Sequence, residues 1–152
     1  MNTTENAIST LKDLIKTSTD GEKGFLSGSE DAKDLSLKQT LRACSQQCAA
    51  AAVELQSCVA TLGGEADHEG TISGAIHRGW TNLKTSMSSD KDLAILQECE
   101  RGEDVAKKAY RQALDKDLPA DIRAIIERQY QGVIQNHDNI KMLRDARAAI
   151  AH

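Results

Sequence analysis

Residues 91–145 read KDLAILQECERGEDVAKKAYRQALDKDLPADIRAIIERQYQGVIQNHDNIKMLRD, and this stretch decides the fold. Mostly apolar side chains recur in it at steps of three and four residues, which is the spacing of one helix face. The first stripe consists of Leu93, Leu96, Cys99, Glu103, Ala106, Tyr110 and Ala113, and the second of Ile122, Ile126, Gln129, Val133, Asn136, Ile140 and Leu143. Two such stripes must be buried against each other and against further helices.

The only proline of the chain, Pro119, separates the two stripes. Proline is tolerated in the first turn of a helix, where its missing N–H is no loss, and it disfavours helical geometry at Leu118 before it. The stretch therefore predicts an antiparallel helical hairpin, which is half of a bundle.

The N-terminal part of the chain predicts the other half. A first helix is expected over about residues 5–31, capped by Thr3 or Thr4. Its stripe consists of Ile8, Leu11, Ile15, Ser18, Glu22 and Phe25. Its interior glycines lower helix propensity by about 1 kcal/mol each relative to alanine and mark a kink or a close approach of a neighbouring backbone. These glycines are Gly21, Gly24 and Gly28.

A second helix is expected from a cap at Asp34 to Leu62, where two glycines end it. Residues 70–87 predict a shorter helix that carries Trp80, and Asp90 can cap the helix that follows. The fold class is therefore all-α, with residues 1–152 forming a single domain. Four long helices form a bundle, with a short extra helix in the crossover between helices two and three.

Length and composition limit the classes of protein that fit. A chain of 152 residues can bury roughly 70% of its unfolded surface without disulfides or metal. The formal net charge of −4 without a basic block argues against nucleic acid as a partner. No apolar run approaches the roughly 20 residues of a membrane span, and the polar start does not resemble a signal peptide. A cytoplasmic protein with four reduced cysteines is expected.

Four segments resemble a known family. They are DGEKGF (20–25), GAIHRGWTNLK (74–84), ECERGED (98–104) and the stretch over 110–145. Together they resemble an uncharacterised bacterial family, classed as a domain of unknown function with a ferritin-like four-helix bundle. The resemblance implies the fold and brings no established activity.

Ferritin-like di-iron proteins carry a Glu on each of two helices and a Glu-x-x-His motif on each of the other two. Glu22 can stand for the first carboxylate and Glu100 or Glu103 for the second. No histidine follows Glu54 by three residues, and no glutamate precedes His137 by three. A standard ferroxidase centre is therefore not expected, and a di-iron oxidoreductase is the weakest interpretation.

A different internal site is predicted from depth along the bundle. At a rise of about 1.5 Å per residue, six chemistry-bearing side chains fall between roughly 20 and 30 Å along the bundle axis. They are Glu22, Cys44, Cys48, Cys99, Glu103 and His137. Thiolate, imidazole and carboxylate groups at one level can bind a transition metal such as iron, zinc or copper. Glu54 falls at another level, near Lys12, and is expected to form an ion pair with it.

A second interpretation of these residues needs no metal. Each cysteine is then a small buried hydrophobic residue, and the carboxylates pair with Arg42, Lys107 or Arg101. His137 and Asp138 are adjacent and are not expected to face each other, so Asp138 is assigned to Arg144 or Lys141. Both interpretations stay open at this stage.

A partner-binding patch is predicted on the short helix. His77, Arg78 and Trp80 lie there, and Trp and Arg are common in binding hot spots. Packing of His77 and Trp80 in the core is the alternative. No catalytic Ser-His-Asp arrangement or phosphate-binding loop is present in the sequence. The favoured function is therefore a non-enzymatic bundle that acts through homo-oligomerisation or a protein partner, with a stress-related role by fold analogy alone. Metal binding is the alternative.

Overall fold

The computed structural model describes residues 2–65 and 90–151, and these residues form four helices and no strand. The prediction of an all-α bundle is confirmed. The helices are α1 (Thr3–Asp31), α2 (Leu35–Thr61), α4 (Lys91–Leu114) and α5 (Ala120–Ala151). The predicted helix over residues 70–87 lies outside the described residues.

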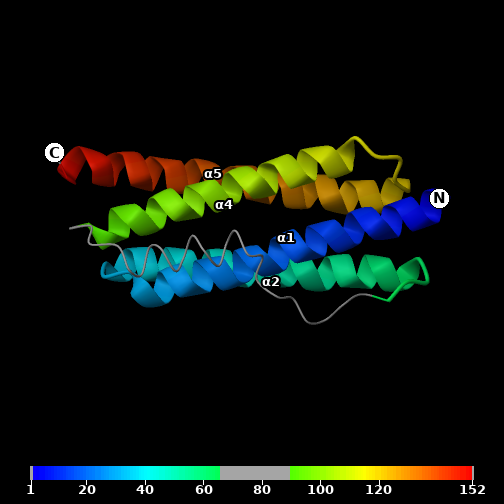
Figure 1. Cartoon of the computed structure of the whole chain (residues 1–152), viewed down its shortest axis with the longest axis horizontal. Coiled ribbons are helices and arrows are strands. Elements are labelled where there is room, and N and C mark those ends of the chain that lie inside the picture. Colours follow the sequence, from blue (N-terminus) through cyan, green and yellow to red (C-terminus); the bar gives the residue numbers. More distant parts are fainter. Residues whose placement is uncertain (1, 66–89, 152) are drawn as a thin grey trace.

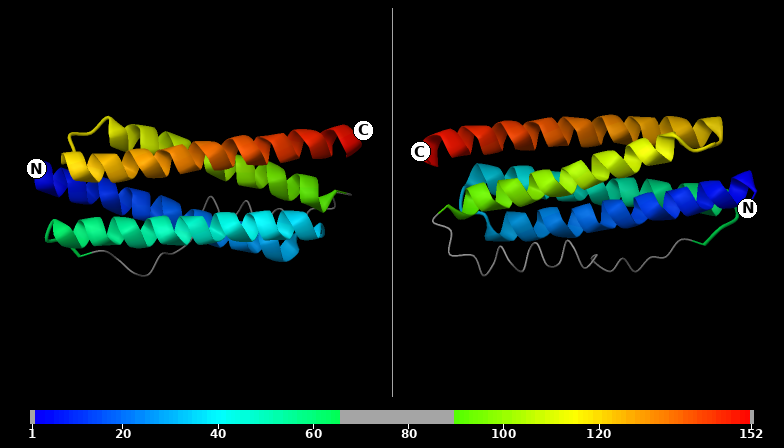
Figure 2. Two further views of the ribbon diagram at one scale, coloured as in Figure 1. Left: turned by 180° about the vertical axis from the view of Figure 1, so that it is seen from behind. Right: turned by 45° about the horizontal axis from the view of Figure 1, so that its top comes forward.

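The four helices lie side by side along one long axis (Figure 1). α1 and α2 form one antiparallel hairpin, and α4 and α5 form the other, as both further views show (Figure 2). The end of α2 and the start of α4 lie at opposite ends of the bundle, which fits a crossover between them. α1 packs on α2 and α4, whereas α5 contacts α4 closely and α2 sparsely. No described helix combines the length and apolar character that a membrane crossing requires.

Polar side chains begin the helices. The predicted caps Asp34 and Asp90 are confirmed, because Asp34 accepts from Ser36 N at 3.1 Å and Asp90 accepts from Leu93 N at 3.1 Å. The predicted cap of α1 is wrong. Asn2, not a threonine, accepts from the backbone N–H of the third residue of the helix, Glu5, at 2.8 Å. Asparagine suits this position as well as threonine does, and the observed cap lies one residue before the nearer predicted one.

The ends of the hairpins follow the glycine and proline signals. Gly63 has a φ of +83°, which ends α2, and Gly64 N donates to Val59 O at 3.0 Å. Pro119 directly precedes α5, one residue before the first turn in which it was predicted, and its carbonyl accepts from Arg123 N at 2.9 Å. The Arg123 side chain closes the turn by donating to the Leu114 carbonyl at 2.7 Å.

The core consists of two apolar layers with a polar level between them. One layer contains Ala7, Leu11, Leu14, Ile15, Leu55, Cys58, Val59, Tyr110, Ala113, Leu118, Ile122 and Ile126. The other contains Phe25, Ala32, Leu37, Leu41, Cys44, Ile95, Leu96, Cys99 and Ile140. The predicted stripes of α1, α4 and α5 contribute to both layers. Leu143 is the one exposed member of these stripes, at 40%.

Candidate functional site

A cavity of about 450 Å³ lies between the two apolar layers, and all four described helices contribute to its wall. The sequence explains the space, because small residues from each helix meet at this level: Gly21, Gly24, Ala50, Ala51, Gly102, Ala106 and Gly132. Side chains this small cannot fill the centre of a bundle. Phe25 and Tyr110 both line the cavity, and each belongs to a different apolar layer.

Glu103 is the unusual group in the cavity wall. It is only 4% exposed, and its Oε2 finds no hydrogen-bond partner within residues 2–65 and 90–151. Burial, assisted by the negative charge of Asp104, raises the pKa of Glu103 to about 8. The carboxyl group is therefore mostly protonated at neutral pH and can both donate and accept a hydrogen bond.

A chain of polar contacts borders the cavity beside Glu103. Tyr110 Oη donates to Gln129 Oε1 at 2.7 Å, and Gln129 Nε2 donates to Glu54 Oε1 at 2.7 Å. Arg128 pairs with the same Glu54 carboxylate. The chain links α4, α5 and α2, and it was not predicted from the sequence. It uses the polar atoms of Tyr110 and Gln129, whereas the free oxygen of Glu103 stays available.

The cysteines near the cavity are weak nucleophiles. All four cysteines of the chain are free thiols, and Cys48 and Cys99 line the cavity. Burial, with a smaller contribution from Glu103, raises the pKa of Cys44 to about 11 and raises that of Cys48 further. Burial also raises the pKa of Cys99 well above its ordinary value. These thiols are protonated at neutral pH, so neither nucleophilic attack nor thiolate ligation is favoured.

The six side chains of the predicted internal site do not all meet. Cys48, Cys99 and Glu103 line one cavity, and Cys44 lies close enough to raise the pKa of Cys99. Glu22 is half-buried and does not line the cavity. His137 is buried, but it faces Asp104 instead of Glu103, with 2.8 Å between Nε2 and Oδ1. Side chains at the same height along the bundle axis can still point in different directions around that axis.

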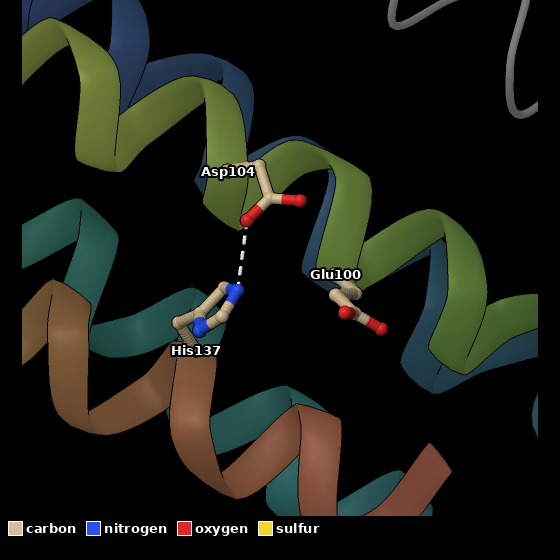
Figure 3. Close-up of side chains that lie close together, drawn as sticks. All are labelled: Glu100, Asp104 and His137. Atoms are coloured by element: carbon tan, nitrogen blue, oxygen red, sulfur yellow. Dashed lines mark ion pairs between the residues drawn. The ribbon is translucent and has the colours of Figure 1, made fainter. Parts of the chain in front are cut away.

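His137 belongs to a different group, together with Glu100 and Asp104 (Figure 3). Within the described ranges, these three offer ligand atoms that all lie within 4.8 Å of one another, and no trio drawn from the six predicted side chains does so. Glu100 and Asp104 are one turn apart on α4, and His137 faces them from α5. Arg144 Nη1 already lies 2.7 Å from Glu100 Oε2. The sequence signal for this group is the pair of acidic residues four apart on α4.

Several predicted ion pairs are wrong. Glu54 pairs with Arg128 instead of Lys12, because the long Arg128 side chain reaches it from α5. Arg101 pairs with Glu98 on its own helix, at 2.5 Å, and does not reach a buried carboxylate.

The predicted pairing of Asp138 with Arg144 is also wrong. Arg144 contacts Glu100 and Asp145 instead. Asp138 Oδ1 lies 3.4 Å from Nδ1 of His137, the preceding residue on the same helix.

Asp92 was not predicted to have a role, yet it is 2% exposed. It accepts from the backbone N–H groups of Lys33 and Asp34 at 2.8 and 3.0 Å. These bonds attach the turn between α1 and α2 to the start of α4, so Asp92 holds the two hairpins together at one end. The predicted partner patch of His77, Arg78 and Trp80 lies outside the described residues.

A known protein family matches most of the chain. The family is described as Domain of unknown function (DUF2383), and the match covers residues 6–116. The chain belongs to this family. No curated protein matches it. Membership in DUF2383 confirms the resemblance at the level of the family, whereas the ferritin-like class and a bacterial source stay predictions.

Proposed function

We propose that this member of DUF2383 is a non-enzymatic binding protein that takes a small molecule into the cavity between its two helical hairpins. The observation that carries the proposal is the unpartnered Oε2 of Glu103 in the wall of that cavity. A buried polar atom without a partner costs about 1–3 kcal/mol. A ligand that hydrogen-bonds to it removes that cost.

The cavity has the properties of a ligand site. Its volume of about 450 Å³ lies in the range of small-molecule pockets, which are mostly apolar with a few polar groups that fix orientation. A larger side chain at Gly102, where a Cβ meets no atom within 4 Å, would fill part of the space and stabilise the core. A bundle that keeps both an unfilled centre and an unpaired carboxyl group has given up stability there, which is common at functional sites.

Binding is favoured over catalysis by the state of the thiols. The cysteines beside the cavity have raised pKa values and are poor nucleophiles at neutral pH.

Filling the cavity tests the proposal. Ligand-detected NMR with 2-phenylethanol should show saturable binding to the full chain and loss of that binding in Ala106→Phe, whose new ring occupies the cavity. Ala124→Phe is the matched control, because Ala124 is exposed on α5. Gly102→Leu is a second filling variant, since a Cβ at Gly102 meets no atom within 4 Å. Thermal unfolding confirms that each variant is folded. No binding, or equal binding in filled and control variants, would contradict the proposal.

A second candidate function is the binding of a divalent transition metal by Glu100, Asp104 and His137. The specific observation is the convergence of one imidazole and two carboxylates within 4.8 Å. Nitrogen and oxygen ligands of this kind suit zinc, manganese or iron. The nearby Arg144 would have to leave Glu100 when the ion binds.

Elemental analysis of protein purified without chelator tests this second candidate. It predicts a substoichiometric to stoichiometric amount of one metal that is lost in His137→Ala and kept in Glu103→Gln, because Glu103 is not part of the trio. Metal content at background, or content unchanged in His137→Ala, would remove it.

Homo-oligomerisation, a protein partner at Trp80, a stress-related role and a cytoplasmic location stay predictions from the sequence. The described surface carries exposed apolar side chains that fit an additional partner: Leu26, Leu35, Val53, Val105, Met142, Leu143 and Ile150.

A further inference from the structure

Both guanidinium groups that line the cavity are already paired. Arg101 pairs with Glu98, and Arg128 pairs with Glu54. Neither positive charge is therefore free to meet a ligand. Glu103 remains as a buried carboxyl group in the described wall, and its Oε2 has no hydrogen-bond partner there.

Resting on the proposed function, we infer that the ligand is a small organic amine whose ammonium group meets Glu103 and whose apolar part lies against Phe25 and Val133. All three residues line the same cavity. An ammonium group supplies the donor that the unpartnered Oε2 lacks. A hydrogen bond between charged groups is roughly twice as strong as a neutral one, and it is strongest where water is excluded.

A carboxylate ligand fits this wall less well than an amine does. Neither guanidinium group in the described wall is free to pair with it, and its negative charge would lie beside a carboxyl group that has no cationic partner.

An inorganic cation fits this cavity less well. Among the described side chains, no three His, Cys, Asp or Glu ligand atoms from the cavity wall lie within 4.8 Å of one another. The two thiols in the wall are protonated, and a metal ion would have to displace both protons. A single ammonium group needs only one strong acceptor and an apolar surface, and the cavity supplies both.

Three probes that share one apolar body test the inference by isothermal titration calorimetry at pH 7. They are phenethylamine, 2-phenylethanol and 3-phenylpropionate. The full chain should bind the amine about tenfold more tightly than the alcohol, and the carboxylate most weakly. In Glu103→Gln the affinity for the amine should fall to that for the alcohol, while the affinity for the alcohol should change less than about twofold. Glu127→Gln is the matched control, because Glu127 is exposed on α5 away from the cavity wall.

The outcomes separate this inference from the proposed function. Equal or tighter binding of the alcohol or the carboxylate would overturn the amine as ligand and leave the cavity as a binding site. An amine preference that persists in Glu103→Gln would also overturn the inference, since another group would then hold the ammonium. Failure of all three probes to bind would contradict the proposed function itself.

Discussion

The carboxyl group of Glu103 lies where a folded protein usually places an apolar side chain or a paired charge. Its burial was predicted from its place in the stripe between Cys99 and Ala106. Its lack of a partner was not, because that depends on which side chains of three other helices point toward it. Sequence spacing specifies the face of one helix, and it leaves open what that face meets.

Replacing Glu103 should change how stability depends on pH. The folded pKa of about 8 lies above the ordinary value of 4.5, so the unfolded chain loses this proton at lower pH than the folded chain does. The resulting stabilisation of the protonated fold is complete below the unfolded pKa and is lost as the pH rises toward 8. Glu103→Gln cannot ionise and therefore does not lose stability in this way. As the pH rises across that window, the free energy of unfolding of the variant should increase relative to that of the wild type by roughly 1.4 kcal/mol per pH unit.

Urea unfolding at several pH values between 5 and 8 measures the difference. Glu127→Gln, which changes an exposed carboxylate, should show no such trend. A difference between Glu103→Gln and the wild type that stays constant with pH would show that Glu103 ionises normally.

At the scale of the helices, two glycines have opposite surroundings. A Cβ at Gly21 on α1 would lie 2.9 Å from Cys48 Sγ on α2, whereas a Cβ at Gly102 on α4 meets nothing within 4 Å. The sequence predicted a kink or a close approach of a neighbouring backbone at the α1 glycines. At Gly21 a neighbouring side chain makes the close approach instead. The absence of a side chain at Gly102 leaves space in the cavity wall.

Alanine at the two positions should therefore act in opposite directions. Gly102→Ala should raise the free energy of unfolding by about 0.5–1 kcal/mol, because alanine is the better helix former and no clash opposes it. Gly21→Ala should lower it by about 1 kcal/mol or more, because Cys48 must shift in a packed interface. In a Cys48→Ala background, Gly21→Ala should lower the free energy of unfolding by less, because the clashing sulfur is absent. Equal effects at the two positions, measured by urea unfolding, would contradict these packing differences.

The helices themselves were largely predictable. Their stripes, the caps at Asp34 and Asp90, and the breaks at Gly63 and Pro119 are local signals, and each lies within one helix turn of the predicted place. Ion pairs were not predictable in the same way. Glu54 and Arg128 lie on different helices, and their meeting depends on how those helices are rotated about their axes.

At the scale of the whole molecule, the bundle has two apolar layers and, between them, a mostly apolar cavity with a few polar groups in its wall. Depth along the axis correctly placed Cys48, Cys99 and Glu103 at one level. It also placed His137 there, although that side chain faces another side of α4. The cavity could not be predicted from depth, because a void results from what four helices together leave unfilled.

Carbon-13 NMR of the Glu103 carboxyl group, followed through a pH titration with and without phenethylamine, tests the central claim most directly. The Glu103→Gln variant identifies the resonance. The predicted result is a midpoint near 8 in the free protein, which falls when the amine is present because the ammonium group favours the ionised carboxylate. A midpoint at the ordinary value of 4.5 in the free protein, or a midpoint that the amine leaves unchanged, would contradict it.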